Sequence, residues 1–179
     1  MQQSSPWIRR VASRFWDALA LVLVAFAIWK IFIAPRNLDP HNAFPAPHAQ
    51  YARLDGGTFR VVDARGRVLF LDFYASWCEP CKVELPLVEA WAKSHPNAQV
   101  VPVDVGEPIA VVRAFARKYD LANVAFDPTS NAQALFDVKG FPTVVAIDPQ
   151  GKIRAKWPGL NPAIALALSN AEKTLASGR

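Results

Sequence analysis

The chain has only two cysteines, Cys78 and Cys81, which flank two residues between an apolar run and a helical pattern. The run before them, Val68 to Tyr74, is apolar except for Asp72, as expected of a strand buried on both faces of a sheet. The residues from about Cys78 to Ser94 have helical periodicity. A buried strand leading into a helix that opens on a cysteine pair restricts the chain to layered α/β architectures.

The rest of the soluble part alternates between strand and helix patterns. We expect a turn and short edge strand over 54–62, strands over 100–105 and 143–147, helices over 108–119 and 130–136, a hairpin strand over 152–157, and a last helix capped by Asn161. The stripes predicted to face inward are Val83, Leu87, Val88 and Trp91 in the first helix and Ile164, Leu168, Ala171 and Leu175 in the last. The fold class predicted is α/β, with a mixed central sheet flanked by helices.

An apolar segment near the N-terminus, Phe15 to Ala34, is long enough to cross a bilayer. Its twenty residues would span ~30 Å as a helix. Three arginines precede it, which favours a cytoplasmic N-terminus and a single-pass anchor in the inner membrane, with the rest facing the periplasm. The alternative is a cleaved signal peptide, for which Ala25 to Ala27 offers a small-x-small site. The charged residues before and within the segment are Arg9, Arg10, Arg14, Asp17 and Lys30.

A proline-rich stretch follows the apolar segment. Residues 35–50 contain four prolines, which favours an extended, semi-rigid linker. We therefore divide the chain into a cytoplasmic stub and transmembrane anchor (1–34), a linker (35–50) and a folded domain (51–179). The net charge of +5 is modest and spread out, which gives no reason to expect a nucleic-acid partner.

The Cys-x-x-Cys segment reads Trp77-Cys78-Glu79-Pro80-Cys81. A helix N-terminus favours a thiolate, which is the reactive form of cysteine, and Cys78 stands at that terminus. Cys78 can then attack a disulfide and Cys81, deeper in the helix, can resolve the mixed disulfide. Glu79 acts against this, because a neighbouring negative charge disfavours the Cys78 thiolate.

Other uses of the cysteine pair are less favoured. A structural disulfide closing so short a loop constrains the unfolded chain only weakly. A zinc site would need a second ligand pair, and His41, His48 and His95 do not provide one at a usual spacing. We predict no cofactor and no metal site. Copper delivery by the two thiolates stays open as an alternative, although Met1 is the only methionine that could assist.

Three segments in order resemble one branch of the thioredoxin superfamily, the membrane-anchored TlpA/ResA-like thiol–disulfide oxidoreductases. They read LDFYASWCEPCKVELP, VPVDVGE and GFPTVVAIDPQGK. The resemblance implies a thioredoxin-like fold with Cys78 as the nucleophile and a cis bond before Pro142, beside the cysteine pair. It also implies that the backbone at Phe141 pairs with the substrate chain. Trp77 is expected to pack beside the pair and shield it, or to serve core packing alone.

Two carboxylates are candidate partners of the inner cysteine. Asp72 interrupts an apolar strand, where an acid is costly without a role. Glu84 lies three residues after Cys81 and so on the same helix face. The resemblance implies a buried acid at the position of Asp72 in thioredoxins, although some members of the tethered branch have a neutral residue there, and an acid at the position of Glu84 in the tethered branch. We hypothesise that Asp72, Glu84 or both accept the Cys81 proton. The alternative for Glu84 is a solvated surface acid.

The function expected is reduction of protein disulfides outside the cytoplasm. The resemblance implies tasks such as cytochrome c maturation, with electrons supplied by a membrane-embedded donor. The first alternative is the opposite direction of the same chemistry, in a disulfide oxidase or isomerase. The second is the copper or metal-delivery module described above.

Overall fold

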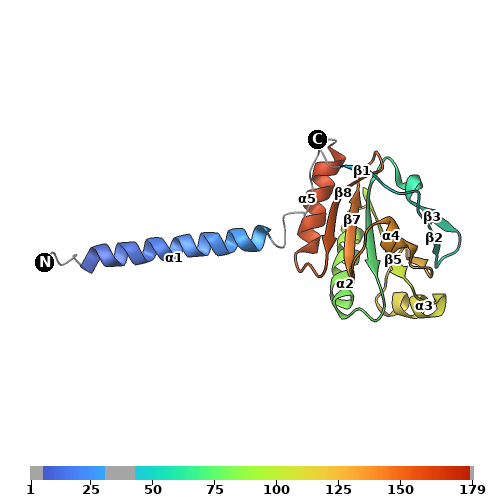
Figure 1. Ribbon diagram of the computed structural model, residues 1–179, viewed down its shortest axis with the longest axis horizontal. Coiled ribbons are helices and arrows are strands. Elements are labelled where there is room, and N and C mark those ends of the chain that lie inside the picture. The colour runs from blue at the N-terminus through green and yellow to red at the C-terminus, as the bar shows by residue number, and fades with distance from the viewer. Residues whose placement is uncertain (1–5, 31–42, 178–179) are drawn as a thin grey trace. The chain divides into compact units, whose positions relative to one another are not determined.

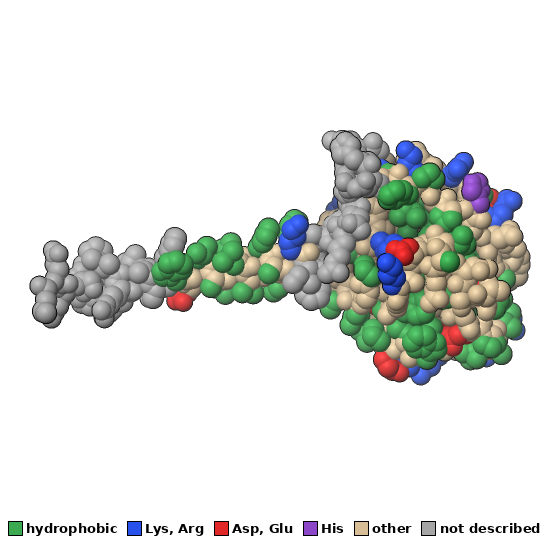
Figure 2. Space-filling view, in the orientation of Figure 1, with side chains coloured by type: hydrophobic (Ala, Val, Ile, Leu, Met, Phe, Trp, Pro, Cys, Tyr) green, Lys and Arg blue, Asp and Glu red, His purple; other side chains and the backbone are tan. Residues whose placement is uncertain are grey.

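The computed structural model describes residues 6–30 and 43–177, with side chains described from residue 16 onward. The chain divides into two units, residues 1–34 and 35–179. The first unit contains helix α1 (Pro6–Ile28), and its described side chains are mostly apolar and exposed, as Figure 2 shows. No helix in the described ranges has both the length and the apolarity to cross a membrane. Residues 31–34 of the predicted anchor and 35–42 of the predicted linker lie outside the described residues.

Eight strands between residues 43 and 177 form one mixed sheet, in the order β1-β8-β7-β4-β5-β6-β2-β3 (Figure 1). The strands are β1 (Phe44–Pro45), β2 (Gln50–Arg53), β3 (Thr58–Arg60), β4 (Val68–Tyr74), β5 (Ala98–Val105), β6 (Ala125–Asp127), β7 (Thr143–Ile147) and β8 (Lys152–Pro158). The helices of this unit are the 3-10 helix η3 (Val61–Ala64), α2 (Glu79–Ser94), α3 (Ile109–Lys118), α4 (Asn131–Leu135) and α5 (Ile164–Ala176). This arrangement confirms the predicted α/β class.

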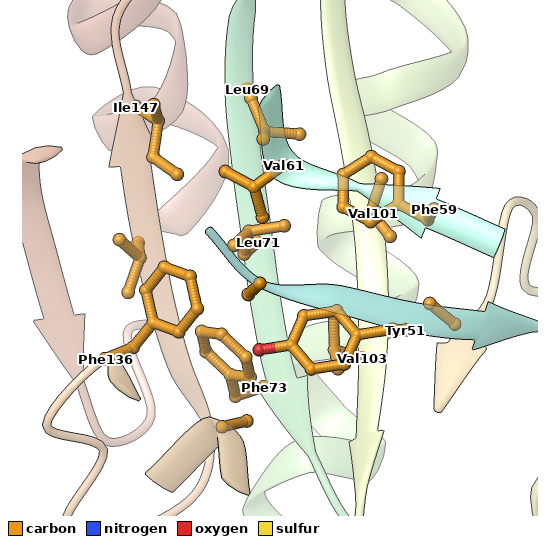
Figure 3. Close-up of a cluster of buried hydrophobic side chains, with 14 of the residues drawn as sticks. Tyr51, Phe59, Val61, Leu69, Leu71, Phe73, Val101, Val103, Phe136 and Ile147 are labelled. Carbon is orange, nitrogen blue, oxygen red and sulfur yellow. The ribbon is translucent and has the colours of Figure 1, made fainter. Parts of the chain in front are cut away.

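Strand β4 lies at the centre of the sheet and organises the core. It runs parallel to β5 and antiparallel to β7, and every one of its residues is buried. Because successive side chains of a strand point to opposite faces, Phe70 packs with α2 and α5, whereas Leu71 and Phe73 pack on the other face with Phe136 (Figure 3). The sequence prediction of a strand buried on both faces is confirmed.

The folded domain begins earlier than the sequence indicated. Strand β1 pairs with Ile153 and Lys152 of β8, and Ala49 is buried in the core. Strand β2 starts at Gln50. The C-terminal end of the predicted linker, from Phe44, therefore belongs to the sheet. The two-residue strand β1 includes a proline, so no strand pattern marks it.

Helix α2 has a buried face different from the predicted stripe. Val88 and Trp91 are buried as expected, but Val83 and Leu87 are 57% and 40% exposed. Glu84 points inward instead, together with the residues Cys81 and Leu85. An acid is tolerated there because the N–H of Asn161 donates a hydrogen bond to its carboxylate.

Helix α5 buries the predicted stripe of Ile164, Leu168, Ala171 and Leu175. It begins at Ile164 rather than directly after Asn161. The Asn161 side chain accepts a hydrogen bond of 3.0 Å from the N–H of Ala163, in the turn that precedes the helix. The predicted polar cap therefore acts on that turn and not on the first residue of α5.

Candidate active site

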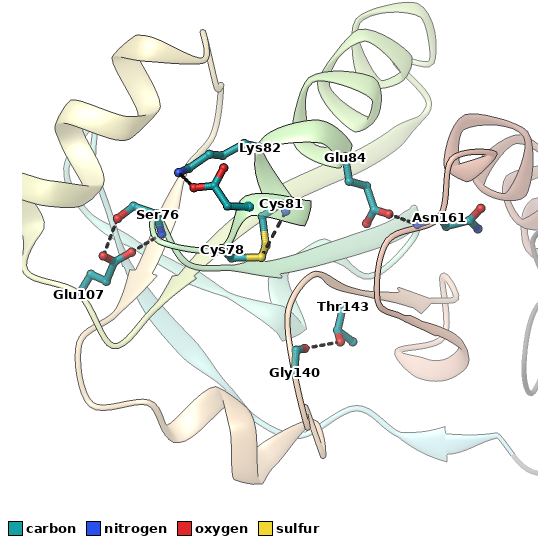
Figure 4. Close-up of a disulfide and its surroundings, with 10 residues drawn as sticks. Ser76, Cys78, Cys81, Lys82, Glu84, Glu107, Gly140, Thr143 and Asn161 are labelled. Atoms are coloured by element: carbon teal, nitrogen blue, oxygen red, sulfur yellow. Dashed lines mark hydrogen bonds and ion pairs between the residues drawn. A yellow bond between two sulfur atoms is a disulfide. The ribbon is translucent and has the colours of Figure 1, made fainter.

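Cys78 and Cys81 form a disulfide at the N-terminus of α2, with an S–S distance of 2.05 Å (Figure 4). Cys78 is the residue immediately before the helix, and its sulfur accepts a hydrogen bond of 3.2 Å from the N–H of Cys81. Cys78 keeps 4% of its surface exposed, whereas Cys81 is fully buried. The structure therefore places the pair as predicted, with an outer and an inner sulfur.

The loop between β4 and α2 is fixed at several points. The N–H of Cys78 donates to the carbonyl of Ala75 at 3.1 Å. The N–H and the hydroxyl of Ser76 both donate to Glu107, at 2.5 and 2.6 Å, which ties this loop to the one that follows β5 (Figure 4). These contacts hold the segment that carries Cys78.

The peptide bond between Phe141 and Pro142 is cis, as predicted. Phe141 packs against the buried cluster that contains both cysteines, which brings the proline loop to the disulfide. The carbonyl of Pro142 accepts a hydrogen bond of 2.7 Å from the N–H of Gly159, and that of Gly140 accepts one of 2.8 Å from the Thr143 hydroxyl. Phe141 lies between Gly140 and Pro142. Within the described part of the chain, neither its N–H nor its C=O has a hydrogen-bond partner.

Trp77 projects into solvent beside this loop. Its side chain is 68% exposed, so the alternative of a core-packing role is wrong. The indole contacts the ring of Phe141 edge-on, with the ring centroids 5.9 Å apart. Trp77 and Phe141 together form an aromatic surface next to the disulfide.

Asp72 is fully buried on β4, and neither of its oxygens has a hydrogen-bond partner within the described residues. Burial raises the pKa of its carboxyl well above the usual range, and the charge of Glu84 raises it further. Asp72 therefore binds a proton more tightly than an exposed carboxyl does.

Glu84 is also buried, which contradicts the alternative of a solvated surface acid. One of its oxygens accepts the 2.6 Å hydrogen bond from Asn161, and the other is buried without a partner among the described atoms. Burial raises the pKa of Glu84 to about 7, against the opposing effect of the Asn161 hydrogen bond. Glu84 can therefore exchange a proton near neutral pH.

A third buried acid, Asp104, was not among the predicted site residues. It lies directly opposite Tyr74 in the pairing of β5 with β4. Burial raises its pKa to about 8, helped by the nearby Glu107. Asp104 interrupts an apolar strand just as Asp72 does, so the same sequence signal could have identified it. Over the ranges described, no cluster of three or more His, Cys, Asp or Glu side chains could hold a metal ion.

This arrangement is suited to thiol–disulfide exchange. Cys78 keeps a small exposed surface and lies beside an aromatic patch and an unpaired stretch of backbone. Cys81 is fully buried, and the buried acids Asp72 and Glu84 have raised pKa values. Exchange needs access to one sulfur and a route for the protons of both.

Comparisons with known proteins agree with this chemistry. Residues 43–156 match the model of the AhpC/TSA family. The thiol–disulfide oxidoreductase ResA of Bacillus cereus is 31% identical over 139 residues, which cover 76% of this chain and 80% of ResA. The thioredoxin-like protein YneN of Bacillus subtilis (strain 168) is 28% identical over 142 residues, covering 76% and 84% of the two chains.

Solved structures give the same result. A Chlorobium tepidum protein assigned as thiol:disulfide interchange protein DsbE superposes with a TM-score of 0.70 at 30% identity, covering 75% of this chain and 96% of that one. The lipoprotein thioredoxin Etrx1 of Streptococcus pneumoniae strain TIGR4 superposes with a TM-score of 0.62 at 27% identity, covering 70% and 98%.

Proposed function

Because the chain belongs to the thioredoxin-like AhpC/TSA family and is a thiol–disulfide oxidoreductase, we propose that it reduces protein disulfides outside the cytoplasm. The observation that carries the proposal is the disulfide at the start of α2, in which Cys78 keeps a small exposed surface and Cys81 has none. Only the outer sulfur is placed to meet a disulfide on another protein.

The reaction proceeds in two steps from the reduced form. The Cys78 thiolate attacks one sulfur of the substrate disulfide, which breaks the S–S bond and releases the other sulfur as a thiolate. The Cys81 thiolate then attacks the Cys78 sulfur, which releases the second substrate sulfur and forms the Cys78–Cys81 disulfide. Two electrons pass to the substrate, whose thiolates take up the two protons that the cysteines lose.

The buried acids assist the second step. Cys81 must lose its proton inside the protein, where a thiolate is disfavoured. Glu84 lies one turn further along α2 and has a pKa of about 7, and Asp72 lies on the strand that α2 covers. Glu84, Asp72 or both accept the Cys81 proton.

The substrate chain docks along the proline loop. The N–H and C=O of Phe141 are unpaired within the described residues, so an extended segment can form backbone hydrogen bonds there. The exposed Trp77 ring covers the bound segment from the side. Trp77, Phe141 and Pro142 thus form the substrate-binding surface.

The N-terminal segment anchors the enzyme in the inner membrane as a single pass, with the domain in the periplasm. This is supported by the apolar stretch from Phe15 to Ala34 and the arginines before it, and by the exposed apolar side chains of α1. A membrane-embedded donor returns two electrons to the Cys78–Cys81 disulfide. Cysteines of apocytochromes c are among the substrates, as the resemblance to the tethered branch implies.

Trapping tests the exchange role. In the full chain in detergent, Cys81→Ala leaves a mixed disulfide unresolved, so substrate proteins should remain bound to Cys78 until a reductant is added. The matched variant Cys78→Ala should trap none. The exchange role would be contradicted if Cys81→Ala formed no adducts and the wild-type chain did not reduce insulin.

The reduction potential tests the direction of the reaction. A value near about −270 mV, as in thioredoxin, supports a reductase. A value near about −120 mV, as in strong periplasmic oxidants, would exclude reduction as the main activity.

A further inference from the structure

A single carboxylate outside the predicted site holds the loop that carries Cys78. Glu107 accepts the backbone N–H of Ser76 with one oxygen, at 2.5 Å, and the Ser76 hydroxyl with the other, at 2.6 Å. Ser76 stands two residues before Cys78, and Glu107 follows β5 (Figure 4). Hydrogen bonds to a charged carboxylate are among the stronger ones in proteins.

The contact falls at the middle of a short loop. On one side the chain is fixed by Tyr74 at the buried end of β4, and on the other by Cys78 at the start of α2. Between them, Ala75 accepts the Cys78 N–H through its carbonyl, while Trp77 points into solvent. Glu107 therefore fixes the part of the loop that strand and helix leave free.

The local backbone is built to aim Glu107 at the loop. Gly106 has a φ of +87°, and a Cβ placed on it would come within 2.9 Å of Ser130 Oγ. Only glycine combines this left-handed turn with so close an approach. The N–H of Gly106 donates to the carbonyl of Asp127 at 2.8 Å, which anchors the turn to β6.

A second acid, Asp104, lies near Glu107. Asp104 is fully buried three residues earlier, and its pKa of about 8 means that it is protonated at neutral pH. The cause is first its burial and then its proximity to Glu107.

We propose that Glu107 is a positioning residue of the disulfide site, which holds Ser76 so that the loop presents the Cys78 sulfur to the substrate disulfide. The inference rests on the proposed exchange function and adds a residue to it. Misplacing a reacting group by about 1 Å can lower a rate on the order of a hundredfold, so a loop anchor of this kind affects rate as well as stability.

The test compares two variants of the reduced full chain in detergent. Glu107→Ala removes both acceptors. Glu107→Gln removes the charge but keeps the contacts, because its carbonyl can accept the Ser76 N–H and its amide can donate to the Ser76 oxygen. We expect kcat/KM for insulin reduction to fall about tenfold in Glu107→Ala and to stay within about threefold of wild type in Glu107→Gln.

The pH dependence of Cys78 alkylation separates positioning from a charge effect. Loss of a nearby negative charge would shift the apparent pKa of Cys78 equally in both variants. If Glu107→Gln is as slow as Glu107→Ala, or if Glu107→Ala matches wild type, the positioning role is wrong. If the wild-type chain reduces no disulfide at all, it is the exchange function that fails.

Two further variants control for stability. Asp148→Ala removes another buried carboxylate that accepts two backbone N–H bonds, from Gln150 and Lys152, at the opposite end of β7 from Pro142. It should lower the unfolding temperature without changing kcat/KM. Ser76→Ala loses only the hydrogen bond from its hydroxyl to Glu107. We expect this variant to fold and its kcat/KM to fall about threefold. The inference would be overturned if Ser76→Ala kept the wild-type kcat/KM while Glu107→Ala failed to fold.

Discussion

The backbone N–H of Asn161 donates a hydrogen bond of 2.6 Å to the carboxylate of Glu84, which ties the segment before α5 to the helix that carries the cysteines. The acceptor is an ionisable group, and burial places its pKa at about 7. The link between α2 and the C-terminal part of the domain therefore depends on pH within the physiological range.

The first prediction concerns stability. The pKa of Glu84 rises from 4.5 when unfolded to about 7 when folded, so the folded state binds the proton more tightly. Stability therefore falls as pH rises from about 4.5 to about 7, by roughly 3 kcal/mol in total. Glu84→Gln should remove most of this loss, and urea unfolding of the oxidised chain at pH 4 and pH 8 measures it. Glu79→Gln, at an exposed acid of the same helix, is the control. An equal effect in that variant would attribute the pH dependence of stability to the overall charge of the helix and not to Glu84.

The second prediction separates the proton route from stability. Asp72 has a raised pKa because it is buried, so Asp72→Asn should stabilise the folded chain above neutral pH. The same change removes a proton acceptor, and we expect resolution of the mixed disulfide by Cys81 to slow about tenfold. Stopped-flow measurement of product release at pH 7 tests this. Unchanged release, with the stability gain present, would leave Glu84 as the only acceptor.

The third prediction concerns the two thiols after reduction. Cys81 is fully buried and Cys78 is not, so iodoacetamide should alkylate Cys78 at least about ten times faster. Mass spectrometry of peptides from briefly labelled protein measures the ratio. Equal labelling would mean that the inner sulfur becomes accessible on reduction, and the order of attack proposed above would fail.

The fourth prediction tests the packing that supports the site. Leu168 of α5 is fully buried, so Leu168→Ala should lower the free energy of unfolding by about 3 kcal/mol. Leu166 lies on the same helix but is 49% exposed, and Leu166→Ala should cost under about 1 kcal/mol. Urea titrations of both variants provide the comparison, and similar losses would contradict the described orientation of α5.

The strands and helices with continuous patterns were predictable from the sequence. The bounds of β4 and β7 match the predicted runs, because each is a block of buried apolar residues. Strands β1 and β6 have two and three residues, too few for any periodicity, and form because the sheet provides partners. Their hydrogen bonds join segments that are distant in sequence, so the local strand propensity of these residues does not predict them.

The site was predictable only where the signal was local. The cysteine pair and the cis proline lie within short motifs, and both were found. Val83 was wrongly placed on the inward stripe of α2, because hydrophobic periodicity favours an apolar residue over the neighbouring acid Glu84. What holds Glu84 inside is the N–H of Asn161, which is distant in sequence. The contact of Glu107 with Ser76 spans 31 positions and leaves no local pattern either.

The two edges of the sheet affect how readily this domain pairs with other polypeptide chains. Its outermost strands, β1 and β3, have only two and three residues; one contains Pro45, which has no N–H to offer, and the other ends in the cation Arg60. Short edges with a proline or a charge give another chain little to pair with. A domain with such edges can meet extended polypeptide segments at high concentration without joining them in an aggregating β-sheet.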